Sequence, residues 1–195
     1  MNDTGATSGQ PAVYLFSGPC GCGKSTLADA FAKHLVNRCG QQQVYVIHGD
    51  DFHHGFVERD DKGPCFVDGQ PTNALDWPGI LAFNWECILM VAGKALGKGL
   101  DVVIDYVVEE ELPLVRELAR TYDARLYYVV LTASREEIRR RITQRGDVEL
   151  IERAWFLKDK LESMPENQGH VLDNTALPAE REAEQLDIER YRLNV

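Results

Sequence analysis

The chain has 195 residues, which is enough for one domain with a sizeable core and too few for two comfortable ones. Apolar residues make up 44% of it and charged residues 27%, an ordinary balance for a globular protein. The formal net charge of −10 argues against a general nucleic-acid binder, which would need a basic surface, although it leaves room for a local positive pocket.

Cysteine usage, the amino-terminal segment and hydropathy all bear on the compartment. The 5 cysteines are odd in number and scattered, which does not resemble a disulfide framework. Residues 1–11 are polar and lack the apolar core of a signal peptide, so we expect a flexible tail there. We find no apolar run of the length that spans a bilayer. The sequence therefore predicts a cytoplasmic monomer or homodimer that binds neither membrane nor nucleic acid.

The predicted elements alternate between strands and helices, and residues 12–195 form a single domain. We expect strands at 13–16, 44–47, 100–108, 125–131 and 170–172, and helices at 24–37, 77–96, 113–122, 135–145, 148–164 and 178–191. Residues 52–76 are irregular, and such a stretch inside a domain is usually functional or mobile. The alternation predicts an α/β fold of three layers, α/β/α, in which helices cover both faces of a five-stranded parallel sheet.

A phosphate-binding loop follows the first predicted strand. Residues 18–25, Gly-Pro-Cys-Gly-Cys-Gly-Lys-Ser, match the pattern G-x-x-x-x-G-K-[ST] without a mismatch. Glycines let successive N–H groups point at a phosphate, and the following helix adds the positive end of its dipole. Lys24 would reach the β- and γ-phosphates of ATP, and the Ser25 hydroxyl would bind Mg²⁺. The expected nucleotide-binding residues are Gly18, Cys20, Gly21, Cys22, Gly23, Lys24, Ser25 and Thr26.

Two cysteines inside this loop, Cys20 and Cys22, are unusual. Their spacing is too short for a usual zinc pair, which has two to four residues between its ligands. Either they are small residues that the loop tolerates, or a thiolate near the helix N-terminus has a lowered pKa and makes the loop sensitive to oxidation.

Further motifs distinguish the classes of P-loop protein. The chain has no N-K-x-D motif, and its D-x-x-G matches at Asp60 and Asp76 do not follow an apolar strand, which argues against a GTPase. The strand that ends in Asp105 is followed by Tyr106, whereas a motor or transport ATPase usually has a water-activating glutamate at that position. The pattern favours phosphate transfer to a bound acceptor over hydrolysis.

An acidic pair, Asp50 and Asp51, comes directly after the second predicted strand. Ligands of open parallel sheets bind at this strand end, and a carboxylate there can orient an acceptor hydroxyl and take its proton. Neighbours on an extended chain point apart, so we expect only one of the two to face the site. We assign Asp51 as the base and Asp50 as a helper of Mg²⁺. The alternative is an acidic pair that caps a turn or the next helix.

Arginines are dense in the helix predicted at 135–145. Arg141 and Arg145 are i,i+4 neighbours whose mutual repulsion a bound phosphate would relieve, and arginine can grip phosphate oxygens in a bidentate manner. On charge alone a solvated helix face is the simpler interpretation, because two glutamates of the same helix can pair with its arginines. The position between the fourth strand and the next helix favours a phosphate clamp.

Taken together, these residues resemble the small P-loop kinases of the nucleoside monophosphate kinase fold over about residues 12–190. The resemblance is strongest to the group of gluconate kinase, shikimate kinase, chloramphenicol phosphotransferase and zeta-toxin-like proteins. It implies Mg-ATP-dependent phosphorylation of a small-molecule hydroxyl, on a sugar-like metabolite, a nucleoside or an antibiotic. The remaining alternatives are a nucleoside or nucleotide kinase and a non-catalytic ATP-binding sensor.

The resemblance also implies roles for particular residues. A lid at about residues 135–147 would close Arg141 and Arg145 over ATP. Asn174 and Thr175 would belong to a loop that packs on adenine. Asp105 stands at the third-strand position, where it would face the acceptor or Mg²⁺.

The helix predicted at 77–96 departs from the pattern of gluconate and shikimate kinases, which carry acceptor-binding arginines near their second and third helices. It contains no arginine and offers Trp77, Asn84, Trp85 and Glu86 instead. These residues suit a neutral or cationic polyhydroxy compound, a nucleoside or an antibiotic. Core packing is an equally simple explanation for Trp85.

Overall fold

The computed structural model describes residues 9–56, 66–67, 70–71 and 75–195. Its main sheet has parallel strands in the order β2-β5-β1-β6-β7, and the short β8 pairs with β6 in the antiparallel direction. The strands are β1 (Ala12–Ser17), β2 (Val44–His48), β5 (Asp101–Asp105), β6 (Arg125–Thr132), β7 (Val171–Asp173) and β8 (Arg192–Leu193). The predicted five-stranded parallel sheet is confirmed, and the antiparallel edge strand was not predicted.

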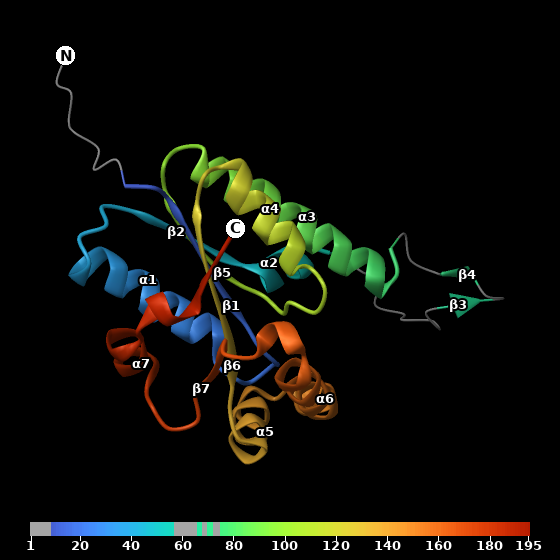
Figure 1. The fold of residues 1–195 in the computed structure, drawn as a ribbon. Coiled ribbons are helices and arrows are strands. Elements are labelled where there is room, and N and C mark those ends of the chain that lie inside the picture. The colour runs from blue at the N-terminus through green and yellow to red at the C-terminus, as the bar shows by residue number, and fades with distance from the viewer. Residues whose placement is uncertain (1–8, 57–65, 68–69, 72–74) are drawn as a thin grey trace.

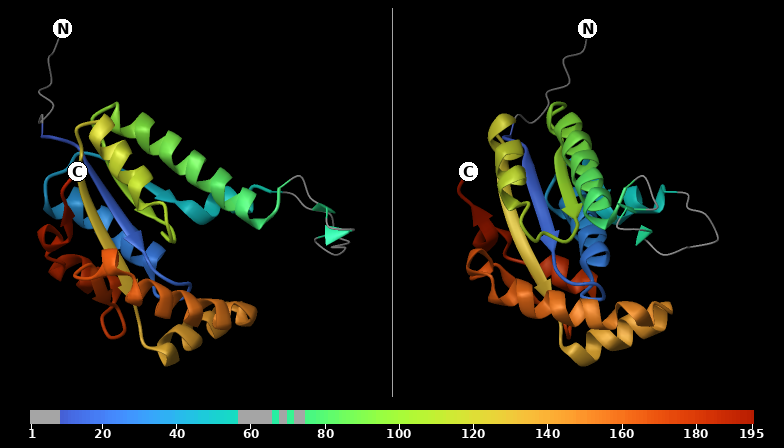
Figure 2. Two further views of the ribbon diagram at one scale, coloured as in Figure 1. Left: turned by 45° about the vertical axis from the view of Figure 1, so that its right-hand side comes forward. Right: turned by 90° about the vertical axis from the view of Figure 1, so that its right-hand side faces the viewer.

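Helices lie on both faces of this sheet, as predicted (Figure 1). On one face α3 (Trp77–Leu96) and α4 (Leu112–Thr121) form a core with the strands, and on the other α1 (Lys24–Arg38) and α7 (Ala179–Gln185) do so. Figure 2 shows α5 (Arg135–Arg145) and α6 (Ile151–Ser163) beyond one end of the sheet. The remaining elements are α2 (Gly49–His54), single turns at Val148–Leu150, Pro165–Asn167 and Ile188–Tyr191, and the antiparallel pair β3 (Phe66–Val67) and β4 (Gln70–Pro71).

The central strand β1 explains why the sequence shows a short continuous apolar run. Its side chains point alternately to the two faces, so Val13 and Leu15 enter the core under α3, and Tyr14 and Phe16 enter the core under α1. All of β1 is buried, as expected for a strand covered on both sides. The ring of Tyr14 stacks on that of Tyr127 with a centroid distance of 4.9 Å, which joins β1 to β6.

Several predicted boundaries differ from the structure. The strand predicted at 100–108 ends at Asp105, and beyond it the Val108 amide donates to the side-chain oxygen Ser17 Oγ at 2.9 Å rather than to a backbone carbonyl of a neighbouring strand. The last predicted helix ends at Gln185, because Leu186 is extended. Helix α2 was not predicted, since six residues are too few to show helical periodicity. The irregular stretch 52–76 lies largely outside the described residues.

Helix α3 is long and apolar enough to cross a membrane by length and composition alone, with a mean hydropathy of 1.4 over a window of 18 residues. The expectation that no apolar run reaches such a length is therefore wrong. In the structure this helix lies against the sheet, where Trp85, Ile88 and Ala92 are buried in the core that contains β5. Its composition is accounted for by packing on one side, although Phe83 and Met90 remain exposed.

Candidate active site

The predicted phosphate-binding loop joins β1 to α1 at the carboxyl end of the central strand. Gly23 immediately precedes α1 with a φ of 99°, and no described side chain caps the helix, so its first N–H groups are free to meet an anion. A Cβ on Gly23 would lie 2.6 Å from Asn174 Nδ2, so only glycine fits there. Lys24 folds back over the loop and its Nζ donates to Pro19 O at 3.2 Å.

Much of the rest of the loop is enclosed by neighbouring elements. Gly18, Gly21 and Cys22 are buried, while Ser25 and Thr26 in the first turn of α1 are exposed. Exposure of these two hydroxyls next to a buried loop is what binding of phosphate and Mg²⁺ requires.

Two side chains from distant elements hold the outer face of the loop. Asn174 Nδ2 donates to Cys22 O at 2.8 Å. Arg141 Nη1 donates to Cys22 O at 3.0 Å and to Gly21 O at 3.4 Å, and its Nη2 donates to Asn174 O at 2.8 Å. Because the carbonyl and N–H of a peptide unit point in opposite directions, bonds to the outer carbonyls help to keep the N–H groups turned inward.

Glu137 fixes the guanidinium of Arg141, since its Oε1 accepts from Arg141 Nε at 2.7 Å. It also accepts from Arg140 Nε at 2.7 Å. The hydrogen bond from Arg140, followed by that from Arg141, lowers the pKa of Glu137 to about 2. The arginines of α5 are thus paired with a glutamate, as the alternative interpretation of this helix expected, but Arg141 simultaneously contacts the phosphate loop.

A cavity of about 330 Å³ lies between α5 and the loop that links β7 to α7. Arg145, which is exposed, lines it together with Arg141 and Asn174. This is where the sequence resemblance places adenine. Thr175 does not line the cavity, because its Oγ1 accepts from the Ser134 amide at 2.9 Å. The full lining is Gly23, Thr26, Arg141, Gln144, Arg145, Asn174, Leu177, Pro178 and Ala179.

Asp105 links three elements at the carboxyl edge of the sheet. Its Oδ2 accepts from Ser25 Oγ at 2.5 Å, and its Oδ1 is hydrogen-bonded to Nδ1 of His48. His48 Nε2 lies 3.4 Å from Asp29 Oδ1 on α1. Sequence reasoning missed His48 as a partner of Asp105. The parallel register, which pairs the last residues of β2 and β5, brings them together.

Burial governs the protonation of this pair. It raises the pKa of the Asp105 carboxyl, and the hydrogen bonds from Ser25 and His48 offset only part of that effect. Burial acts to lower the pKa of His48, but its hydrogen bond with Asp105 and the charges of Asp105 and Asp29 outweigh it, so the pKa is raised. Both shifts favour a proton held between the two side chains.

The oxygen atoms of Ser25 and Asp105 are suited to Mg²⁺, which takes one or two protein ligands together with phosphate oxygens and water. Within the described ranges no group of three or more His, Cys, Asp or Glu side chains could hold a metal ion on its own. A magnesium ion shared with a nucleotide fits this arrangement. Asp50, the other expected magnesium ligand, is exposed on α2.

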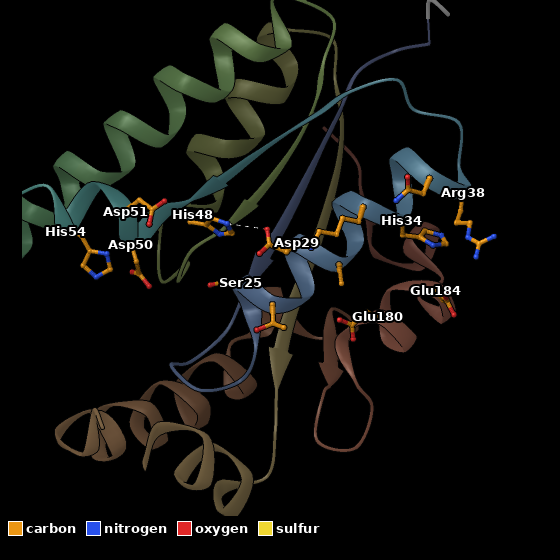
Figure 3. Close-up of a pocket in the computed structure, with 14 residues that line it drawn as sticks. Ser25, Asp29, His34, Arg38, His48, Asp50, Asp51, His54, Glu180 and Glu184 are labelled. Atoms are coloured by element: carbon orange, nitrogen blue, oxygen red, sulfur yellow. Dashed lines mark ion pairs between the residues drawn. The ribbon is translucent and has the colours of Figure 1, made fainter. Parts of the chain in front are cut away.

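The acidic pair after β2 lies in the first turn of α2, not on an extended chain. Successive helical residues are about 100° apart, so both Asp50 and Asp51 line one groove of about 600 Å³ that runs along α1 (Figure 3). The expectation that only one of them faces this side is wrong for that reason. Carboxylates in a first turn also stabilise the helix dipole, so the capping alternative is compatible with the structure.

The groove extends from the phosphate loop along the exposed face of α1 to the far end of that helix, with α2 on one side and α7 on the other (Figure 3). Its end next to Ser25 is acidic, and its far end is mixed in charge. The lining residues are Ser25, Thr26, Asp29, Ala30, Lys33, His34, Asn37, Arg38, His48, Asp50, Asp51, His54, Glu180 and Glu184.

Tyr106 positions α2 relative to α3. A Cβ on Gly49 would lie 2.3 Å from Tyr106 Cδ2, so the helix can begin against the ring only with glycine at this position. The phenol oxygen accepts from Asn84 Nδ2 at 2.8 Å, and the ring of Trp85 packs edge-on with a centroid distance of 5.4 Å. Trp85 is 3% exposed, so the core interpretation of this tryptophan is confirmed.

The two loop cysteines lie in different environments. Cys22 is fully buried, and burial raises the pKa of its thiol. The lowered pKa that would make it redox-sensitive is therefore wrong for Cys22, which serves as a small core residue. Cys20 is partly exposed and packs against the apolar cluster of Ile138 and Ile142 between α5 and α6.

Comparisons with known proteins agree with this fold. The AAA_33 family, described as an AAA domain, matches residues 13–155. The chain is 25% identical over 141 residues to the guanylate kinase of Geobacter metallireducens, a match that covers 69% of this chain and 65% of the length of that protein.

Solved structures that resemble this chain include two kinases. The APS kinase CysC of Mycobacterium tuberculosis, in complex with AMPPNP and APS, has a TM-score of 0.62 at 19% identity, covering 90% of this chain and 95% of that one. A gluconokinase from Sinorhizobium meliloti 1021 has a TM-score of 0.51 at 20% identity, covering 93% and 91%. At these identities the likeness shows the fold alone. Since the family match spans more than half of the chain, the protein belongs to the AAA_33 family and has the small P-loop fold of the nucleoside monophosphate kinase type.

Proposed function

We propose that this protein is an ATP-dependent phosphotransferase that phosphorylates a hydroxyl group of a small molecule. The observation that supports it most is the phosphate loop with the Ser25–Asp105 pair at its base. A loop that cradles phosphates beside a magnesium-binding pair is what phosphoryl transfer requires, because that reaction depends on positioning and on neutralising charge. The absence of a glutamate at Tyr106, after β5, favours an acceptor other than water.

The roles of the loop residues follow from their positions. The Lys24 ammonium and the free N–H groups of α1 stabilise the charge of the phosphoryl group during transfer. Arg145, at the end of α5, lines the cavity next to the loop, where it can reach a phosphate. Arg141 acts indirectly, through its hydrogen bonds to the outer carbonyls of the loop. A magnesium ion bound by Ser25 and Asp105 would neutralise the β- and γ-phosphate oxygens.

Asp51 is our candidate for the base. It is exposed in the groove that begins at Ser25, so a substrate hydroxyl can reach both Asp51 and the phosphate loop. In this step the acceptor oxygen bonds to the γ-phosphorus, the bond to ADP breaks, and the hydroxyl proton passes to the carboxylate. Neither α2 nor the first four turns of α3 contains lysine or arginine, which favours a neutral or cationic acceptor. Trp77 is 55% exposed and lies edge-on to His53, so it offers an aromatic surface beside α2.

A nucleotide acceptor is the second candidate, because the curated relative is a guanylate kinase. The two candidates differ in the charge that the acceptor end must accommodate. A nucleoside monophosphate carries a phosphate of its own, for which α2 and the first four turns of α3 offer no lysine or arginine. A nucleoside or a polyhydroxy amine carries none.

The test is ADP release from Mg-ATP in the presence of single compounds: sugars, sugar acids, nucleosides, nucleoside monophosphates and amino sugars. We expect one class to raise turnover well above the acceptor-free rate, and Lys24→Ala to abolish the increase. Lys98→Ala, an exposed lysine outside the site, is the control. If ATP binds but no acceptor raises turnover, the proposal fails and a nucleotide sensor takes its place.

A further inference from the structure

A second cavity, of about 360 Å³, lies at the amino edge of the sheet and is separate from the proposed catalytic site. It is formed where the end of α4, the start of β6 and the strand β8 meet. Strand β6 runs from this cavity to the edge where the phosphate loop lies, and its eight residues span about 26 Å at a rise of about 3.3 Å each. In Figure 2 the carboxyl end of the chain lies toward this end of the sheet, away from α5 and α6.

Three arginines from three different elements line this cavity: Arg120 from α4, Arg125 from β6 and Arg192 from β8. Asp123 is the single carboxylate side chain among the lining residues, and its Oδ1 already accepts from Gln10 Nε2 at 3.1 Å. Val195 also lines the cavity with its main-chain carboxylate, so three guanidinium groups face two carboxylates and the lining stays net positive, on a protein whose formal net charge is −10.

Arg125 is the inner member of the group. Its Nη1 donates to Tyr127 Oη and its Nη2 to Gln10 O, each at 3.2 Å, while its Nε is buried and has no partner among the described residues. A buried guanidinium N–H without an acceptor is unfavourable, so an acceptor from outside the chain would stabilise this arrangement.

The two outer arginines are only loosely engaged. Arg120 Nη1 lies 3.2 Å from Glu117 Oε2, and Arg192 Nη1 lies 3.9 Å from Glu189 Oε2, in pairs whose four side chains are all more than half exposed. Exposed ion pairs of this kind contribute roughly 0–1 kcal/mol, so the guanidinium groups can exchange these partners for a ligand.

We propose that this cavity binds an oxyanion of the phosphate or sulfate type, either free or as the phosphoryl group of a small phosphomonoester. Guanidinium groups match tetrahedral oxyanions through paired N–H donors, and three of them converging on one cavity repel one another until an anion neutralises them. The site is independent of the catalytic proposal, because it shares no residue with the phosphate loop.

The experiment must separate this site from the phosphate loop, which also binds phosphate. We therefore use full-length Lys24→Ala protein as the parent and titrate it calorimetrically with sulfate, inorganic phosphate and glucose 6-phosphate at constant ionic strength. We expect saturable binding at one site. Tighter binding of glucose 6-phosphate than of the inorganic ions would identify a phosphomonoester ligand, and the reverse order would identify a free anion.

The double substitution Arg120→Gln/Arg192→Gln in this parent should weaken binding at least tenfold. The control is Arg153→Gln/Arg181→Gln, which removes the same charge from two exposed arginines elsewhere and should change the affinity less than twofold. Equal losses in both variants would mean a non-specific charge effect and would overturn the proposal. So would unchanged affinity in the first variant.

A substitution that is expected to strengthen binding keeps the proposal testable if the arginine variant fails to fold. Asp123→Asn removes the carboxylate from the cavity, and asparagine tolerates the φ of 48° that Asp123 adopts. We expect it to bind the same anions several-fold more tightly. Unchanged or weaker binding would count against an anion at this place.

Discussion

The phosphate loop and the acidic first turn of α2 meet near Ser25, yet they are held in different ways. The loop is built from backbone groups, and its outer carbonyls are tied by Arg141 and Asn174 from remote parts of the chain. Helix α2 is only six residues long, rests on the ring of Tyr106 and presents exposed carboxylates. The phosphate loop, which would hold ATP, is thus constrained by contacts from several elements. Helix α2, which would meet the acceptor, is held by few contacts, and its chemistry depends on its exposed side chains.

Asp51→Asn should have the largest effect on turnover and almost none on folding. Loss of a general base lowers kcat by about 10²- to 10⁴-fold, and an exposed side chain contributes little to stability. Steady-state kinetics with the identified acceptor and a thermal unfolding curve would measure the two effects.

Asp50→Asn is the matched control on the same turn, and it should act mainly on KM. If the two substitutions lower kcat equally, the assignment of the base to Asp51 fails.

Asp105→Asn tests the magnesium pair at the base of the loop. We expect kcat to fall about 100-fold, because removing one group that helps to stabilise the charge of the transition state has an effect of this size. The Mg²⁺ concentration for half-maximal rate should rise as well, which a titration at saturating ATP would show.

Asp101→Asn is the control for Asp105→Asn. Asp101 is a buried aspartate on the same strand, at the other edge of the sheet, and burial raises its pKa too. It should leave the magnesium dependence unchanged. A similar change in both variants would point to damage of β5 rather than loss of a ligand.

Gly23→Ala should weaken the loop and the binding of ATP together. Both a φ of 99° and the proximity of Asn174 Nδ2 oppose a Cβ there. The left-handed conformation costs an L-residue about 1–2 kcal/mol, and the contact adds to it. We expect ATP affinity to fall at least tenfold in a calorimetric titration.

Gly99→Ala shares only the first of these effects, since Gly99 has a φ of 77° and open space around it. It should lose similar conformational free energy and keep its ATP affinity. Normal ATP binding by Gly23→Ala would show that the loop is less constrained than its contacts suggest.

Glu137→Gln should have the smallest effect on stability and ATP affinity, because it removes only the ion pair that holds the Arg141 guanidinium in place. Ion pairs three or four residues apart on a helix contribute about 0.3–0.5 kcal/mol each, so the free energy of unfolding should fall by less than about 1 kcal/mol at pH 7. ATP affinity should fall only a few-fold, as Arg141 loses one of its partners.

The pKa of Glu137 is lowered from 4.5 to about 2, so the stabilisation is present above pH 4.5 and disappears as the pH falls toward 2. The difference in melting temperature between the parent and Glu137→Gln should shrink over that interval. A difference that is undiminished at pH 2 would show that the charge of Glu137 is not its cause.

The sequence by itself determined the strand–loop–helix unit, the layered α/β fold and the loop whose residues we propose bind phosphate. It could do so because each depends on local patterns: an apolar run buried on both faces, glycines at fixed spacing, and the start of an amphipathic helix. Asp105 was also accessible to sequence reasoning, since a polar residue at the end of a buried strand stands out.

Only the tertiary structure decided which distant residues meet. The His48–Asp105 pair depends on strand register, the contact of Arg141 with Cys22 O depends on how α5 packs, and the second cavity brings α4, β6 and β8 together. Helix α2 could not be predicted from the sequence, because it is too short to show periodicity and its position depends on the contact of Gly49 with Tyr106. Such contacts join residues far apart in the chain, and their spacing in sequence therefore carries no record of them.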